Sequence, residues 1–165
     1  MSTEIIEALG NHRFFAGLAA KDLERIANCG AFKTFPAGSL LTVEGESATT
    51  FFALLEGRAA ILTSVPNRDP IVLQTLGSGA VIGWSWLDEQ DWVFSVRAVT
   101  DCRVIALDAT CLRPQLLADS AFGLEITRRF LRTMTSRLKA TRLQLLDLYG
   151  QGNYGQENYG LSNDG

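Results

Sequence analysis

The pattern of apolar and polar positions divides the chain into a helical start, a β-rich middle and a helical end. Apolar residues recur at helical spacing from Ile5 to Leu9 and from Ala20 to Cys29, which predicts two short helices. From Ala31 onward, short runs rich in β-branched and aromatic residues alternate with glycine or proline breaks. Because no long helical pattern interrupts these runs, we expect antiparallel strands in a sandwich or barrel rather than βαβ units.

The β-rich section ends near Asp108 and helical spacing returns after it. Phe94–Thr100 and Arg103–Leu107 are typical of a last strand pair that closes the section. A short helix is predicted over Ala109–Leu117 and a long one over about Ser120–Tyr149. The pattern alone predicts the α+β class, with short N-terminal helices, an antiparallel β section over about residues 31–108 and a long C-terminal helix.

The long helix carries a seam typical of a coiled coil. Its core positions are separated alternately by three and four residues over more than three heptads. A helix that lies on its own β-domain is the alternative, but the regularity favours a two-stranded coiled coil and hence a homodimer. The predicted seam consists of Leu124, Thr127, Leu131, Met134, Leu138, Thr141, Leu145 and Leu148.

Composition adds limits rather than a function. A chain of 165 residues with 47% hydrophobic and 20% charged residues and a net charge of −3 is typical of one globular domain, without a pull toward nucleic acid or anionic membrane. We expect a folded domain over 1–149 and a Gly/Asn/Gln/Tyr-rich, low-complexity tail over 150–165. Without a transmembrane run or a signal-peptide pattern, the predicted location is cytoplasmic.

Residue types that carry enzyme chemistry are sparse. Cys29, Cys102 and Cys111 are odd in number and form no C-x-x-C pair, so they are predicted to be small core residues rather than a disulfide framework or zinc ligands. His12 is the only histidine, and it is predicted on the surface or at a helix cap. No nucleophile elbow, lysine-bearing phosphate loop or metal-ligand cluster occurs, so we expect no catalysis and no metal.

All three tryptophans of the chain lie in the segment VIGWSWLDEQDWVF, Val81–Phe94, together with three carboxylates. Each tryptophan combines a large apolar ring with one N–H group, so three of them usually form the wall of a pocket, fill one or make an interaction face. We expect Trp84 and Trp92 to lie in or over a cavity. Their indole N–H groups are then predicted to bond backbone carbonyls or nearby acidic side chains.

The segment FPAGSLLTVEGESATTFFALLEGRAAIL contains a Phe-Pro-x-Gly turn, a second glycine followed by an acidic residue, and an apolar strand that ends in a glycine. With the order of helices, β-roll and long helix, it resembles the cyclic-nucleotide-binding domain of Crp/Fnr-type regulators and kinase regulatory subunits, from about Phe14 to Tyr149. The resemblance implies an antiparallel β-roll (jelly-roll-like, a double-stranded β-helix) over about residues 31–108, a long C-terminal dimerisation helix, and a regulatory role in signal transduction. It also assigns Gly38, Gly45 and Gly57 to turns that need positive φ.

The resemblance places Val81–Phe94 on the family's phosphate-binding cassette, and we call this segment the cassette. Members that bind cyclic AMP or cyclic GMP carry a Gly-Glu pair for the ribose hydroxyl, and an Arg-Ser-Ala type segment whose arginine binds the phosphate. The corresponding residues here are Gly83-Trp84 and Trp92-Val93-Phe94, and no arginine lies between Gly83 and Arg97. The cassette is therefore degenerate.

Loss of both anchors weakens the expected binding of a cyclic nucleotide. A buried phosphodiester needs charge-assisted donors, and their loss corresponds to roughly 10²–10⁴-fold in affinity. Asp88, Glu89 and Asp91 would repel the anion, although backbone amides at the N-terminus of the cassette helix can hold one. A cyclic-nucleotide cofactor is therefore not favoured. The pocket is either filled by tryptophan, rebuilt for an apolar or aromatic ligand, or retained as a cyclic-nucleotide site.

Two residues of the long helix match pocket positions of the family. Thr141 aligns with the threonine that contacts adenine from the dimer helix, and Arg137 matches a helix arginine near the pocket. Arg97 alternates with Val96 and Ala98 on a strand, so it is expected to face outward. The candidate pocket comprises Ile82, Gly83, Trp84, Ser85, Trp86, Trp92, Val93, Phe94, Arg97, Arg137 and Thr141.

Two functions from different classes remain open. The family's transcription factors continue into a helix-turn-helix domain, but only 16 residues follow Tyr149, so DNA binding is not expected. The preferred prediction is a non-catalytic regulatory or sensory module whose binding of cyclic AMP and cyclic GMP is weak or lost. The alternative is a structural or adaptor subunit that docks a protein partner through the cassette, the long helix or the tail.

Overall fold

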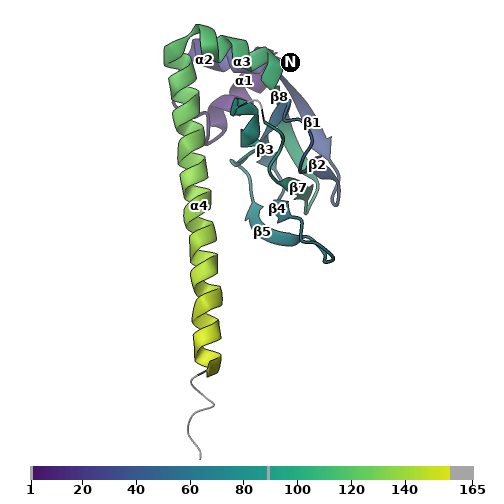
Figure 1. Cartoon of the computed structure of the whole chain (residues 1–165). Coiled ribbons are helices and arrows are strands. Elements are labelled where there is room, and N and C mark those ends of the chain that lie inside the picture. Colours follow the sequence, from purple (N-terminus) through teal and green to yellow (C-terminus); the bar gives the residue numbers. More distant parts are fainter. Residues whose placement is uncertain (1, 89, 157–165) are drawn as a thin grey trace, which may run out of the picture. The chain divides into compact units, whose positions relative to one another are not determined.

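The structure is a computed structural model that describes residues 2–88 and 90–156, with side chains up to Gly150 (Figure 1). It forms two compact units, one ending at Arg129 and one beginning at Phe130. The elements are α1 (Ser2–Asn11), α2 (Ala20–Asn28), β1 (Gly30–Phe35), β2 (Leu40–Thr42), β3 (Thr50–Glu56), β4 (Ala59–Thr63), β5 (Ile71–Leu76), β6 (Val81–Ile82), the 3-10 helix η1 (Trp84–Asp88), β7 (Ser95–Ala98), β8 (Cys102–Asp108), α3 (Ala109–Ala118) and α4 (Ser120–Gln156).

The strands of the first unit form two four-stranded antiparallel sheets, with the orders β1-β8-β3-β6 and β2-β7-β4-β5. Side chains from both sheets meet in one apolar core, in which Leu54 and Val104 of the first sheet and Ala59 and Ala98 of the second are at most 1% exposed. The predicted α+β class, β-roll and flanking helices are confirmed. The first strand, β1, begins at Gly30 and the last strand, β8, ends at Asp108.

One predicted strand pairing is wrong. The strands expected over 94–100 and 103–107 exist as β7 and β8, but they lie in different sheets: β7 pairs with β2 and β4, whereas β8 pairs with β1 and β3. Between them, the N–H groups of Val99 and Thr100 donate to the carbonyl of Arg58. At this point the chain passes from one sheet to the other. The strands β7 and β8 therefore follow each other along the chain but do not pair.

The glycine turns agree with the sequence prediction. Gly38, Gly45 and Gly57 have φ values of 87°, 86° and 96°, in the region that residues with a Cβ rarely adopt. At Gly57 a Cβ would also collide with the carbonyl oxygen of Asp101. This position therefore needs glycine both for its backbone conformation and for the close approach of the connection between β7 and β8.

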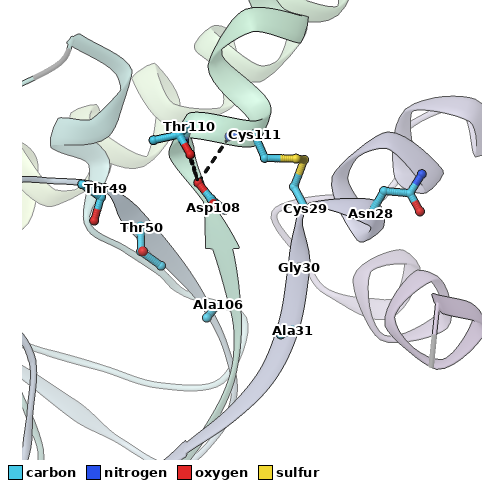
Figure 2. A pocket seen from close by; sticks show the side chains of 10 residues that line it. All are labelled: Asn28, Cys29, Gly30, Ala31, Thr49, Thr50, Ala106, Asp108, Thr110 and Cys111. Atoms are coloured by element: carbon cyan, nitrogen blue, oxygen red, sulfur yellow. Dashed lines mark hydrogen bonds between the residues drawn. A yellow bond between two sulfur atoms is a disulfide. The ribbon is translucent and has the colours of Figure 1, made fainter.

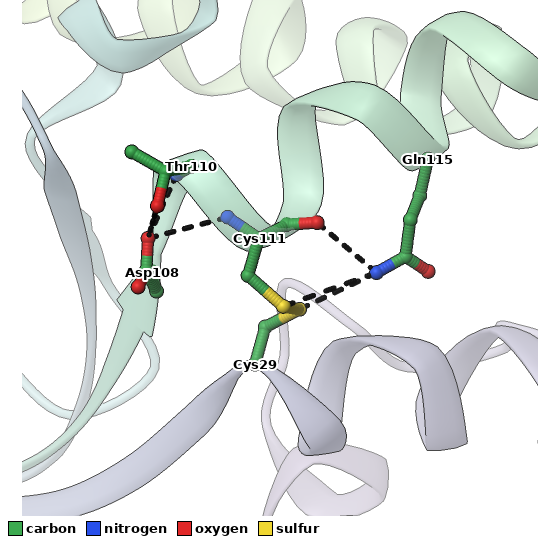
Figure 3. Close-up of a disulfide and its surroundings, with 5 residues drawn as sticks. All are labelled: Cys29, Asp108, Thr110, Cys111 and Gln115. Atoms are coloured by element: carbon green, nitrogen blue, oxygen red, sulfur yellow. Dashed lines mark hydrogen bonds between the residues drawn. A yellow bond between two sulfur atoms is a disulfide. The ribbon is translucent and has the colours of Figure 1, made fainter.

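The prediction for the cysteines is wrong for two of the three. Cys29 and Cys111 form a disulfide between residues 82 positions apart, with their Cα atoms 5.7 Å from each other (Figure 3). Cys102 is a free thiol and 0% exposed, as expected for a small core residue. The pairing depends on the packing of α3 beside the end of α2, which cysteine spacing alone does not reveal.

The surface position predicted for His12 is also wrong, because the side chain is only 4% exposed. Its Nδ1 accepts the backbone N–H of Phe14 at 3.2 Å, and its ring lies 5.4 Å from that of Phe15. Phe14 and Phe15 are themselves buried, so the turn after α1 carries the imidazole into the interior. Burial is the main cause that lowers the pKa of His12 below its usual 6.5.

We expect the burial of His12 to make stability depend on pH. Because its pKa is lower in the folded protein, the unfolded chain binds more protons below about pH 6.5, and the free energy of unfolding falls there. Above that pH the contribution of neutral His12 to the free energy of unfolding is fully present. Between pH 7.5 and 5.5 we expect a loss of about 1 kcal/mol, measured by urea unfolding. His12→Asn keeps an acceptor for Phe14 and should reduce this pH dependence; an unchanged dependence in the variant would assign it to other groups.

The long helix begins at Ser120 as predicted and continues to Gln156, into the segment predicted as a tail. Residues 157–165 of the predicted tail lie outside the described residues. No helix in the described part of the chain has the length and apolar character needed to cross a membrane.

Candidate functional site

The cassette begins where β6 ends and turns directly into η1. Gly83 lies at this turn with φ of 88°, a conformation that brings the chain from the strand into the helix. The indole of Trp92 covers this point, because its Nε1 would lie only 3.1 Å from a Cβ placed on Gly83. The backbone at Gly83 is therefore covered by an aromatic ring from the far end of the cassette.

Trp86 is the tryptophan that is completely buried. It is 0% exposed, and its ring stacks on Phe51 with centroids 4.6 Å apart and planes at 4°. A small apolar cavity of about 10 Å³ lies beside this pair and is also lined by Ile26 of α2 and Leu112 of α3. Trp86 thus anchors η1 in the apolar contact between the first sheet and the helices.

Arg113 of α3 fixes the backbone of the same residue. Its guanidinium donates to the carbonyl oxygen of Trp86 through Nη2 at 2.7 Å and Nε at 3.2 Å. Arg113 is not among the predicted site residues, because it lies 27 residues from Trp86 and no local pattern connects the two. Together, stacking and this forked hydrogen bond hold η1 against α3.

The far end of the cassette pairs with the turn after β2. The N–H of Trp92 donates to the carbonyl of Glu46 at 2.8 Å, and the N–H of Gly45 donates to the carbonyl of Trp92 at 2.9 Å. The predicted hydrogen bond of the Trp92 indole is wrong, because its buried Nε1 has no acceptor among the described residues. The reason is geometric, since backbone pairing points the indole at Gly83 rather than at a free carbonyl.

A hollow of about 530 Å³ lies beside this pairing. The residues that line it are Glu44, Gly45, Gln90, Asp91, Trp92 and Val93. Two of these side chains are carboxylates and none is basic, so the lining repels an anion and offers no charged donor to a phosphate.

The other predicted pocket residues within the first unit take different positions. Ile82 and Ser85 are buried, Phe94 packs against the core, Trp84 is half-buried and Val93 is 40% exposed. Arg97 is exposed on β7, while its neighbours Val96 and Ala98 face the core, which confirms its predicted outward orientation. Its side chain therefore faces solvent rather than the apolar core.

Arg137 and Thr141 lie on α4 in the second unit, so their place in the pocket stays a prediction. Thr141 Oγ1 donates to the carbonyl of Arg137 at 3.0 Å, which satisfies the hydroxyl donor within the helix. Its presence at a core position of the seam therefore does not require a ligand. Among the residues that the structure describes, no group of three or more His, Cys, Asp and Glu side chains is arranged to hold a metal ion.

Comparison with known proteins agrees with this architecture. The family profile described as cyclic nucleotide-binding domain matches residues 32–119, which is more than half of the chain. The chain therefore belongs to the cyclic nucleotide-binding domain family. This result confirms the resemblance expected from the glycine turns and the order of elements.

Three solved structures illustrate the similarity. A candidate cyclic nucleotide-binding protein from Geobacter metallireducens GS-15 is 28% identical over 80% of this chain and 96% of that chain, with a TM-score of 0.72. A cyclic nucleotide-binding domain from Methylobacillus flagellatus is 20% identical over 88% and 83%, with a TM-score of 0.73. A cAMP-bound mutant regulatory subunit of a cAMP-independent protein kinase A from Trypanosoma brucei is 18% identical over 89% and 51%, with a TM-score of 0.70.

Proposed function

We propose that this protein is a cytoplasmic, non-catalytic regulatory or sensory module in which binding of cyclic AMP and cyclic GMP is weak or lost. The observation that supports this proposal is the cassette itself. The Trp92 indole covers Gly83, and the adjoining hollow is lined by Glu44 and Asp91 without a basic side chain. A phosphodiester would lose hydration there without gaining a charged donor.

The family itself is compatible with such a loss. The Trypanosoma brucei neighbour is the regulatory subunit of a kinase described as cAMP-independent, and the form bound to cAMP is a mutant. For that protein, the fold is thus separable from a natural response to cAMP. We propose the same separation here, on the grounds of the cassette residues.

Calorimetric titration tests this proposal directly. We expect cyclic AMP and cyclic GMP to bind no tighter than about 100 μM, because the arginine and the ribose carboxylate are absent. The melting temperature should accordingly stay unchanged at micromolar nucleotide. A low-micromolar dissociation constant for either nucleotide would show that the backbone amides of the cassette suffice, and the proposal would be wrong.

We further propose that α4 forms a parallel homodimer through the predicted seam. Its leucines are exposed in the single chain: Leu124 59%, Leu131 61%, Leu138 71%, Leu145 50% and Leu148 67%. An exposed apolar row at heptad spacing is stabilised when it is covered by a second helix with the same row.

Sedimentation of a seam variant tests the dimer. Leu138→Asp combined with Leu145→Asp should give monomers. At each of these two core positions, the carboxylates of both helices would be buried against each other. The matched control is Leu143→Asp with Leu146→Asp, since these leucines are 58% and 57% exposed but lie off the seam. The control should remain dimeric. A monomeric unmodified protein at micromolar concentration, or equal effects of both variants, would contradict a seam-specific dimer.

Exposed apolar residues outside the seam support the alternative of an adaptor subunit. Leu143, Leu146 and Tyr149 are 58%, 57% and 76% exposed outside the seam, so a coiled-coil dimer leaves them uncovered. They offer an apolar surface to a protein partner. Native mass spectrometry of protein isolated from its source distinguishes the functions: a retained partner without small ligand favours the adaptor, and a retained small molecule favours the sensor.

A further inference from the structure

We propose that Cys29–Cys111 is a reversible thiol–disulfide switch, and that its redox state controls how firmly α3 holds η1 of the cassette. This inference goes beyond the proposed function and holds whether or not the cassette binds a ligand. It rests on three features: the position of the disulfide, its access from solvent, and the contact of Arg113, two residues after Cys111, with the cassette.

The disulfide joins two elements that are far apart in sequence. Cys29 immediately follows α2 and precedes β1, whereas Cys111 lies in the first turn of α3 (Figure 3). The start of α3 is also capped by Asp108, whose carboxylate accepts the N–H groups of Thr110 and Cys111. The helix therefore keeps its own N-cap when the disulfide is opened, while its covalent connection to α2 is lost.

Both cysteines of the disulfide line a hollow, which gives a reductant a route to them. This hollow has a volume of about 500 Å³ and is also lined by Asn28, Thr49 and Thr110, as Figure 2 shows. Cys29 is 8% exposed, and Cys111 is the more exposed of the pair. We therefore assign the first attack of an incoming thiolate to Cys111, the more exposed residue.

The third cysteine does not compete in this exchange. Cys102 is 0% exposed, and its thiol donates to the backbone carbonyls of Arg58 and Thr100 at 3.2 and 3.3 Å. Burial raises the pKa of this thiol, so it is a poor source of attacking thiolate. Reduction should therefore yield the Cys29 and Cys111 thiols without shuffling to Cys102.

The exchange is balanced with a dithiol as reductant. One thiolate of the dithiol attacks Cys111 Sγ, the Cys29–Cys111 bond breaks, and Cys29 leaves as a thiolate that takes up a proton. The Gln115 amide, whose Nε2 lies 3.4 Å from Cys29 Sγ, is placed to stabilise that thiolate. The second thiol of the reductant then displaces Cys111, so the dithiol becomes a disulfide and the protein gains two protons and two electrons.

The link from the disulfide to the cassette is short. Arg113 follows Cys111 by two residues, and its guanidinium donates twice to the carbonyl of Trp86. An α3 that is released from α2 changes the position of this guanidinium more easily than one that is cross-linked. The hydrogen bonds to Trp86 then break more often, and η1 opens more frequently to solvent.

Hydrogen exchange on the full chain, with dithiothreitol as the dithiol, tests the switch. We expect alkylation of Cys29 and Cys111 in the folded protein, protection of Cys102, unchanged helix content, and about tenfold faster exchange in peptides covering Trp84–Asp88. Reoxidation should restore the slow exchange. The proposal is overturned if reduction requires a denaturant, if it unfolds the whole protein, or if exchange in this segment does not change.

Two variants separate the switch from a merely structural cross-link. Cys29→Ser with Cys111→Ser should show the fast exchange of the reduced state at every dithiol concentration. Arg113→Gln should still be reduced and reoxidised, but its cassette exchange should differ less than about twofold between the two states. A full tenfold difference in Arg113→Gln would show that Arg113 does not transmit the change, and would overturn the proposed link.

Discussion

Trp84→Glu combined with Trp92→Arg is expected to give this protein measurable affinity for cyclic AMP. The two substitutions restore the ribose carboxylate and the phosphate arginine that the family resemblance assigns to these positions. A charge-assisted hydrogen bond contributes about 1.5–3 kcal/mol, so we expect a gain of 10²-fold or more in the association constant. Calorimetric titration of the variant beside the unmodified protein measures this gain.

The fold should tolerate these two changes, because the fully buried tryptophan is Trp86. Trp84 and Trp92 are only half-buried, and the buried Nε1 of Trp92 has no acceptor among the described residues to lose. Removing the Trp92 indole also uncovers the backbone at Gly83, where it now lies. The space freed there becomes available to a ligand.

A matched control distinguishes the effect of the two added charged groups from the effect of removing the two indoles. Trp84→Gln with Trp92→Gln removes the same indoles without adding the two charges, and it should gain little affinity. A folded Glu/Arg variant without any gain would mean that the pocket has been rebuilt beyond these two anchors. An unfolded variant would instead assign both tryptophans to the core, contrary to their partial exposure.

Removal of the disulfide by Cys29→Ser with Cys111→Ser should lower the free energy of unfolding by about 2–4 kcal/mol. The cross-link closes a loop of 82 residues, so it strongly restricts the unfolded chain while the folded chain keeps its contacts. Guanidinium unfolding of the oxidised protein and the variant measures the difference. Reduced protein should match the variant.

The remaining cysteine supplies the comparison for this experiment. Cys102→Ser changes one sulfur to oxygen at a buried position and leaves the cross-link intact. It should therefore lower the free energy of unfolding by only about 1 kcal/mol. Stability of the double variant within about 0.5 kcal/mol of the oxidised protein would contradict a structural contribution of the disulfide.

The sequence by itself determined the class of fold and most of its elements. The two N-terminal helices, the β-rich middle and the start of the long helix follow from local periodicity. The turns at Gly38, Gly45 and Gly57 follow from a backbone conformation that glycine alone adopts readily. The outward position of Arg97 follows from strand alternation, which is equally local.

Only the tertiary structure decided which groups meet across the fold. Cys29 pairs with Cys111, Arg113 binds the carbonyl of Trp86, and β7 and β8 separate into different sheets. Of the three tryptophans, Trp86 is the one that is completely buried, and its ring stacks on that of Phe51. These outcomes depend on contacts between segments tens of residues apart. Spacing and periodicity describe the neighbours of a residue along the chain, whereas pairing, stacking and burial depend on its neighbours in space.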